Sequence, residues 1–195
     1  KPLLGKPLIA WPIEAALKSK YIDDVIVTTD GEDIAQVAKE YGANVPWMRP
    51  DFLAGDSAKR IDVIGHAIEN LAAYDLIVYL EPTSPLTEAI DIDNALDLLS
   101  NNSSSATSIV GVSESGCSHP EYSLKNEGEL IRPYMIDKFS DLKINRQELS
   151  DSFYFDGSLY ISFISALKQH GEFYHDFTMP YLSPKWKSFE IDDIE

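Results

Sequence analysis

The sequence predicts an α/β fold: a single domain built on a doubly wound, mostly parallel β-sheet. Short apolar runs typical of buried strands alternate with helical patterns through the first half of the chain. A chain of 195 residues with 44% hydrophobic residues can bury one substantial core, but not two. Alternating strands and helices favour a sheet joined by right-handed crossovers.

The first strand and the first helix of this alternation are expected at residues 24–29 and 31–41. Residues 25–27 are Val, Ile and Val, a continuous apolar run of the kind found in strands covered on both faces. The helix carries apolar side chains at helical spacing and is expected to end at Gly42, because glycine commonly follows helix C-termini.

The elements that follow continue the alternation. Isoleucine and leucine recur at helical spacing beyond residue 57, and two further apolar runs read as buried strands. The predicted order is helix, strand, helix and strand, at residues 57–72, 75–80, 91–99 and 106–112.

The second half of the chain is different, because residues 114–152 are largely polar. Residues 122–125 and 130–135 predict a hairpin that turns at Gly128. The segment 118–152 is too small for a domain, so we expect it to protrude and to pack on the main body or on a second copy. A strand, a short helix and an edge segment should follow, at residues 154–163, 165–170 and 189–192.

The net charge of −16, from 16 basic and 32 acidic side chains, argues against nucleic-acid binding, which needs a basic face. No apolar run approaches the roughly 20 residues of a membrane span. The apolar stretch near the start is interrupted by Lys6, Pro7 and Pro12, unlike a signal peptide. A single cysteine, Cys117, excludes an internal disulfide and favours the cytoplasm.

Polar groups follow three of the predicted strands, at the edge where open α/β sheets bind ligands. Two prolines bracket Thr83 and Ser84 directly after a buried strand, which gives a stiff loop with two hydroxyls. Asp30 has two interpretations, as a ligand-binding group or as the N-cap of the next helix. The three polar strand ends are residues 28–30, 81–86 and 111–113.

Five motifs lie along the chain in order, and together they span nearly all of it. The third begins with Arg-Pro-Asp at residues 49–51, the fourth is Glu-Pro-Thr-Ser-Pro-Leu, and the fifth joins Asp-Gly-Ser-Leu-Tyr-Ile to Glu-Ile-Asp. Together they resemble the acylneuraminate cytidylyltransferases, which make CMP-sialic acid and related activated sugars. The motifs occupy residues 1–11, 27–30, 49–66, 81–86, and 156–161 with 190–192.

The resemblance implies a Rossmann-like nucleotidyltransferase that joins CTP to an acidic nine-carbon sugar. The anomeric hydroxyl would attack the α-phosphorus and pyrophosphate would leave, so catalysis rests on positioning and charge stabilisation. Mg²⁺ is the implied cofactor, and it would also offset the repulsion between an acidic protein and two anionic substrates. The resemblance further implies a homodimer formed through residues 118–152.

The same resemblance assigns roles to single residues. Asp192 and Glu190 would bind Mg²⁺ and, with Arg146 at the sugar carboxylate, would form the catalytic set. The nucleotide would be held by Thr29, Asp30, Arg49, Asp56, Lys59 and Arg60. The sugar would be held by Glu81, Pro82, Thr83, Ser84, Asp156, Gly157 and Tyr160.

The chain also departs from the family pattern. The family's first strand and its Gly-, Arg- and Lys-rich phosphate loop are expected upstream of Lys1, and residues 1–195 alone should fold but lack transferase activity. Glu81 and Asp156 replace two amides, which exchanges donors for acceptors and predicts a sugar other than ordinary N-acetylneuraminate. Glu190 replaces an aspartate of the metal pair, and Thr87 stands where arginine is frequent.

Alternatives remain open. Arg49 and Arg146 fit a ligand-binding role and a solvated surface position alike. Cys117 and His119 lack further ligands nearby, so zinc is not expected. A cytidylyltransferase for Kdo, an eight-carbon acidic sugar, ranks lower because that family's Gln-Gly-Asp-Glu-Pro string is missing at residues 81–85. A non-catalytic nucleotide-binding relative is the third possibility.

Overall fold

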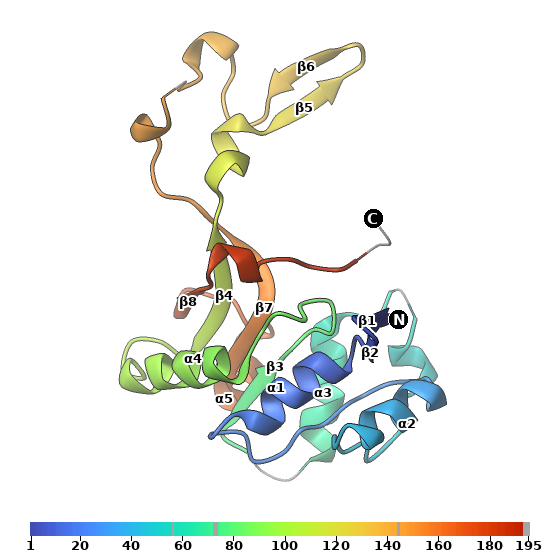
Figure 1. Cartoon of the computed structure of the whole chain (residues 1–195). Coiled ribbons are helices and arrows are strands. Elements are labelled where there is room, and N and C mark those ends of the chain that lie inside the picture. Colours follow the sequence, from blue (N-terminus) through green and yellow to red (C-terminus); the bar gives the residue numbers. More distant parts are fainter. Residues whose placement is uncertain (56, 72–73, 144, 193–195) are drawn as a thin grey trace.

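A computed structural model describes residues 1–55, 57–71, 74–143 and 145–192. Its central sheet has four strands in the order β3-β7-β4-β8 (Figure 1). The strands β3, β4 and β8 point the same way, and β7 runs antiparallel between β3 and β4. The α/β class is therefore confirmed. The sheet is mixed: three strands share one direction, as predicted, but both pairings of β7 are antiparallel. The strands are Leu76–Tyr79 (β3), Ser108–Glu114 (β4), Phe153–Phe163 (β7) and Thr178–Leu182 (β8).

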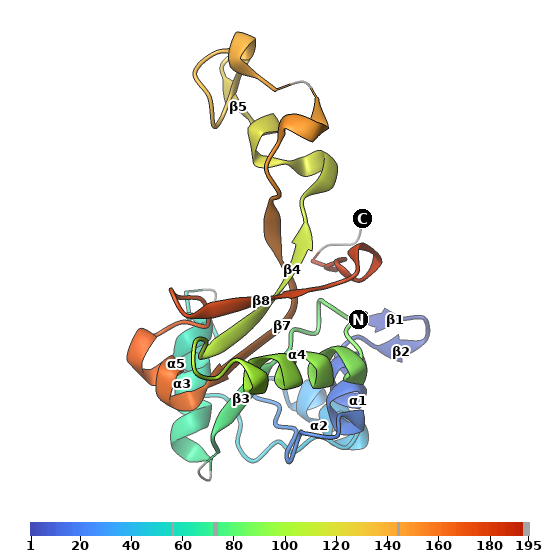
Figure 2. The same cartoon turned by 90° about the vertical axis from the view of Figure 1, so that its left-hand side faces the viewer.

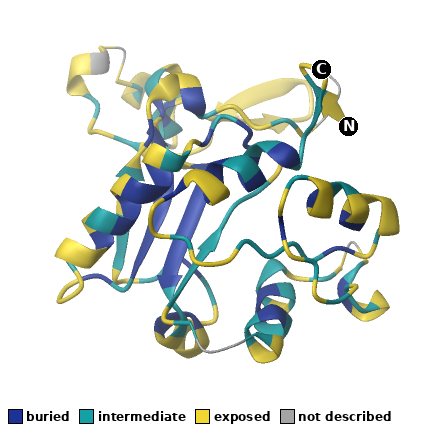
Figure 3. Cartoon of the chain, turned by 60° about the horizontal axis from the view of Figure 1, so that its bottom comes forward, coloured by how far each residue is buried: buried dark blue, intermediate teal, exposed yellow. Residues whose placement is uncertain are grey.

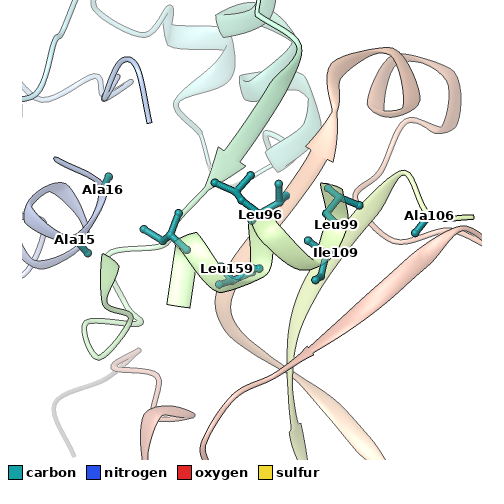
Figure 4. Close-up of a cluster of buried hydrophobic side chains, with 10 residues drawn as sticks. Ala15, Ala16, Leu96, Leu99, Ala106, Ile109 and Leu159 are labelled. Carbon is teal, nitrogen blue, oxygen red and sulfur yellow. The ribbon is translucent and has the colours of Figure 1, made fainter. Parts of the chain in front are cut away.

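Helices cover both faces of the sheet (Figures 1 and 2). Helices α1 (Ala10–Lys18) and α4 (Ala89–Asn101) pack on one face, where Leu99 and Ile109 belong to one buried cluster (Figure 4). Helices α3 (Arg60–Asn70) and α5 (Ile164–His170) pack on the other face. Buried residues line the sheet and the inner sides of these helices (Figure 3). Each fully buried aliphatic side chain contributes about 1.5–3 kcal/mol, so the layered core holds the fold together.

The predicted helices are confirmed with small changes of bounds. Helix α2 (Glu32–Glu40) lies within the predicted 31–41, and α3 is shorter than the predicted 57–72. The predicted helix at 91–99 is extended at both ends in α4. In the part of the chain that the structure describes, no helix is both long and apolar enough to cross a membrane.

Three edge elements differ from the sequence prediction. Among the described residues, the expected strand at 24–29 forms one isolated parallel bridge, between Ile26 and Asn44. The Val27 amide donates to Asn44 O at 2.9 Å and the Asn44 amide donates to Val25 O at 2.8 Å. Residues 189–192 form no strand, although the amide of Ile191 donates to Thr83 O at 2.8 Å. Strand β8 was not predicted, and it contains Pro180, which edge strands tolerate.

A bulge of four residues interrupts the pairing of β7 with β4. Val110 pairs with Tyr160 and Val112 pairs with Phe155, so residues 156–159 all lie opposite the single residue Gly111. The bulge lies in the middle of β7, and because β7 is reversed, it comes directly beyond the carboxyl end of β3, where Tyr79 pairs with Tyr160. Bulges often re-aim side chains next to functional sites.

Residues 118–152 form an arm that projects from the sheet between β4 and β7 (Figures 1 and 2). Strands β5 (Leu124–Glu127) and β6 (Leu130–Pro133) confirm the predicted hairpin, and Gly128 turns it with a φ of +76°. Several large apolar side chains of the arm face solvent in the single chain, which is typical of an interaction surface. They are Leu124, Leu130, Ile131, Tyr134, Met135 and Phe139.

Candidate functional site

Three segments converge where the loop after β3 meets the bulge of β7. Gly157 lies in the bulge with a φ of +69°, a conformation that favours glycine. A Cβ atom at this position would lie 1.8 Å from Glu190 Oε1 and 2.9 Å from Ser84 Oγ. The missing side chain therefore leaves room for the two polar groups. We call Ser84, Gly157 and Glu190 the Gly157 site.

The loop after β3 is tied to the bulge and to the C-terminal segment. Thr87 Oγ1 donates to Ser158 O at 2.9 Å, which joins the loop to the bulge. Thr83 O accepts the Ile191 amide at 2.8 Å, which joins the loop to the segment that carries Glu190. Thr87 is buried and its hydroxyl donates to Ser158 O, so this side chain holds the loop in place.

Asp156 is the most deeply buried acid of the site, with 1% of its surface exposed. Its Oδ1 accepts from the amide and the hydroxyl of Ser158, at 3.0 and 2.6 Å, and its Oδ2 accepts from Ser113 Oγ at 2.9 Å. A buried carboxylate needs such donors to offset its lost hydration. The carboxylate is thus fixed in orientation, held against Gly111 of β4.

Negative charge accumulates around Glu190. Partial burial of its carboxylate over Gly157, followed by the charges of Asp192, Glu81 and Asp156, raises the pKa of the otherwise exposed Glu190 above its ordinary value. Beside it, the buried Ser84 hydroxyl has no hydrogen-bond partner within the described structure. Clustered carboxylates and an unpartnered hydroxyl form an arrangement that a bound cation or a polar substrate would complete.

Glu190 and Asp192 together fit a divalent cation that is shared with a phosphate. Mg²⁺ usually takes one or two protein carboxylates and completes its shell with phosphate oxygens and water. The described part of the chain holds no group of three or more His, Cys, Asp or Glu side chains suited to a metal.

Arg60 lies beside Glu81, although the sequence placed it on the nucleotide side. Its guanidinium is 3.5 Å from Glu81 Oε1 and 3.3 Å from Glu172 Oε1, and it lies 4.5 Å from the ring centroid of Tyr160. Burial and the neighbouring Glu81 raise the pKa of Tyr79 to about 12, so this hydroxyl keeps its proton. Sequence reasoning missed Tyr79 and Glu172, because only the fold brings them to Arg60.

Arg49 and the strand-end residues 28–30 form a second polar group. Arg49 Nη2 donates to Thr28 O at 2.5 Å, and the Arg49 amide donates to Thr29 O at 2.8 Å. Asp30 does not cap α2, whose N-cap is Gly31 and has no side-chain cap. The capping interpretation of Asp30 is therefore wrong, and its carboxylate stays exposed.

The remaining predicted nucleotide and catalytic residues are not gathered at the Gly157 site. Lys59 is an exposed residue at the start of α3. Asp56 lies outside the described residues. The 3₁₀ turn Arg146–Glu148 belongs to the arm, away from the sheet (Figure 1). The structure therefore does not bring the backbone of Arg146 to the Gly157 site within one chain, and the side chain of Arg146 is outside the described part.

Comparison with known proteins gives matches over most of the chain. Residues 1–157 match the family model described as cytidylyltransferase. The chain is 34% identical to a CMP-N,N'-diacetyllegionaminic acid synthase of Legionella pneumophila, over 92% of this chain and 77% of that protein. It is 33% identical to an N-acylneuraminate cytidylyltransferase of Escherichia coli, over 98% of this chain and 44% of that protein.

A pseudaminic acid cytidylyltransferase of Campylobacter jejuni is 29% identical, over 98% of this chain and 82% of that protein. Among solved structures, CMP:2-keto-3-deoxy-manno-octonic acid synthetase complexed with CTP matches with a TM-score of 0.64 and 13% identity. That match covers 94% of this chain and 82% of the other. At this low identity the structural match supports the fold alone.

Proposed function

The chain belongs to the cytidylyltransferase family, and from this premise we propose that it activates an acidic nine-carbon sugar of the nonulosonic class with CTP. The products would be the CMP-sugar and pyrophosphate. The observation that carries the proposal is the Gly157 site, where Ser84, Gly157 and Glu190 converge at the ligand-binding edge of the sheet.

In this proposal the chain's own groups position the reactants. Glu190 and Asp192 hold a divalent cation, with Mg²⁺ as the proposed ion, which when bound supplies positive charge to the phosphate oxygens. The buried Ser84 hydroxyl donates a hydrogen bond to a reactant, because nothing in the described structure occupies it. The packed loop and bulge keep these groups fixed, so little reorganisation is needed during the reaction.

The sugar side would be formed by Glu81, Asp156 and Tyr160, with Arg60 above the Tyr160 ring. Asp156 has its oxygens occupied by Ser113 and Ser158, so it acts on the sugar mainly through its charge and the shape of the bulge. Glu81 still offers acceptors for hydroxyl or amino groups. These acids favour a sugar with donor groups near the bulge. The nucleotide is proposed to bind to four other residues: Thr29, Asp30, Arg49 and Lys59.

Replacing Arg60 with methionine should raise the KM for the sugar about tenfold and change the KM for CTP little. The substitution removes the 3.5 Å ion pair between Arg60 and Glu81, and a tenfold change corresponds to about 1.4 kcal/mol of lost interaction. Steady-state kinetics with each substrate varied in turn measures the effect, and Lys168→Met on the exposed end of α5 is the control. A rise in the KM for CTP alone would contradict this prediction and would indicate that Arg60 contributes to nucleotide binding instead.

We also propose that two copies associate through the arm. Its exposed apolar side chains need a surface to cover them, and the hairpin is too small to bury them itself. Light scattering at micromolar concentration should give the mass of a dimer, and Ile131→Glu should shift the mass toward the monomer. A monomer in the unmodified protein would count against this proposal.

The test of the proposed function is product identification by mass spectrometry. The full-length protein is incubated with CTP or GTP and, in turn, legionaminic, pseudaminic and N-acetylneuraminic acid and Kdo. A CMP adduct of at least one nine-carbon acid is expected. An adduct of Kdo alone would instead support the eight-carbon alternative, and the absence of any nucleotide adduct would support a binding protein without catalysis.

A further inference from the structure

The C-terminal segment that carries Glu190 is fastened to the start of α4 by a buried lysine. Lys187 has 5% of its surface exposed, and its Nζ lies 2.6 Å from Glu88 Oε2 and 2.5 Å from Asp91 Oδ2. Burial lowers the pKa of Lys187, but its hydrogen bonds to Asp91 and Glu88 outweigh burial and raise it. The ammonium therefore stays charged inside the protein.

The partners of Lys187 are themselves held in place. Glu88 and Asp91 form the capping box of α4, in which the Glu88 amide donates to Asp91 Oδ2 at 2.9 Å. Asp91 Oδ1 accepts from the Tyr181 hydroxyl at 3.0 Å. Lys187 thus docks on a rigid acceptor pair whose geometry is fixed by the helix start and by β8.

A second tie lies on the other side of Glu190. The amide of Ile191 donates to Thr83 O, in the same loop that leads into Glu88. Loop residues 83–88 and segment residues 187–191 therefore run alongside each other, joined near both ends. Between the two ties, Glu190 Oε1 lies over Gly157 and next to Ser84.

The segment has few other anchors in the described structure. Phe189 and Glu190 are exposed, no strand pairing holds residues 188–192, and Ser188 receives one hydrogen bond from the Tyr154 hydroxyl at 3.0 Å. The position of the Glu190 carboxylate therefore depends on Lys187 at one end and on one backbone bond at the other.

We propose that Lys187 is a positioning residue for the reaction: its ion pair with Glu88 and Asp91 sets the affinity of Glu190 and Asp192 for a divalent cation. The proposal rests on the proposed function, since it assigns cation binding to that pair. Lys187 touches no substrate and acts through the position of the segment. Residues that support metal ligands typically change metal affinity by about 10–100-fold when they are removed.

The test is direct Mn²⁺ binding to the full-length protein, measured by electron paramagnetic resonance without substrates. Lys187→Met should raise the Mn²⁺ dissociation constant at least about tenfold, and Lys187→Arg should recover most of the affinity. Lys185→Met is the matched control, because Lys185 is exposed on the same turn and has no ion pair among the described residues. The Mn²⁺ concentration for half-maximal pyrophosphate release should rise in parallel, while the KM for the sugar stays constant.

Unchanged Mn²⁺ affinity in folded Lys187→Met would overturn the proposal. If that variant does not fold, Glu88→Gln decides, because the Glu88 side chain is 62% exposed and the Asp91 contact survives. A severalfold weaker Mn²⁺ affinity with an unshifted melting temperature supports the positioning role, and an unchanged affinity overturns it. If the unmodified protein makes a CMP-sugar but Lys187 variants bind Mn²⁺ normally, only this inference fails and the proposed function stands.

Discussion

Replacing Asp192 with asparagine is expected to lower kcat by about two to three orders of magnitude, the usual effect of removing one electrostatic group from a transition state. The expectation follows from the proposed pair of Glu190 and Asp192, since an amide keeps an oxygen ligand but loses the negative charge. Asp192 is exposed on the C-terminal segment, so the free energy of unfolding should change by no more than about 0.5 kcal/mol.

Pyrophosphate release at saturating substrate measures this effect, with Mg²⁺ varied over a wide range. Glu69→Gln, which removes an exposed negative charge from α3, is the control and should leave kcat unchanged. Full activity of Asp192→Asn in Mg²⁺ would show that Asp192 does not bind the metal ion, and the proposed metal-binding pair with Glu190 would then be wrong.

Replacing Gly157 with alanine is expected to reduce activity by at least about a hundredfold, because a displacement of about 1 Å at a reacting site can have that effect. The added Cβ would come within 1.8 Å of Glu190 Oε1 and 2.9 Å of Ser84 Oγ, so both groups must move. The left-handed backbone adds a strain of about 1–2 kcal/mol in the folded state.

Gly171→Ala separates the two effects of this substitution. Gly171 has a φ of +70°, almost the same as Gly157, but no atom lies within 4 Å of its missing Cβ. Both variants should lose several degrees of melting temperature, at about 2–4 °C per kcal/mol for a protein of this size. Only Gly157→Ala should lose activity. Equal activity of the two variants would show that the Gly157 site is not catalytic.

The main elements of the fold could be predicted from the sequence because apolar periodicity reports burial directly. The helix at 31–41 and the strand at 154–163 were found in this way. Periodicity carries no direction, so the reversed orientation of β7 could not be derived. Strand β8 was missed because it is short, half-exposed and contains Pro180, and thus lacks the pattern of a buried strand.

The strand-end loop was predicted from its prolines and hydroxyls, and in the structure its Ser84 lies beside Gly157. The ion pairs that organise the site could not be predicted in the same way. Lys187 and Asp91 are 96 positions apart, and the contact between Arg60 and Glu172 spans 112 positions. A charged side chain has no periodic signature that identifies its partner, so such contacts emerge only from the folded chain.

The most direct test of the central claim is the initial rate of pyrophosphate release by the full-length protein with CTP, a nonulosonic acid and Mg²⁺, each omitted in turn. The proposed site predicts that release requires all three components, because in the proposal the Gly157 site would bring the sugar to a metal-bound triphosphate. Release that continues at the same rate without the acidic sugar, or without a divalent cation, would contradict it.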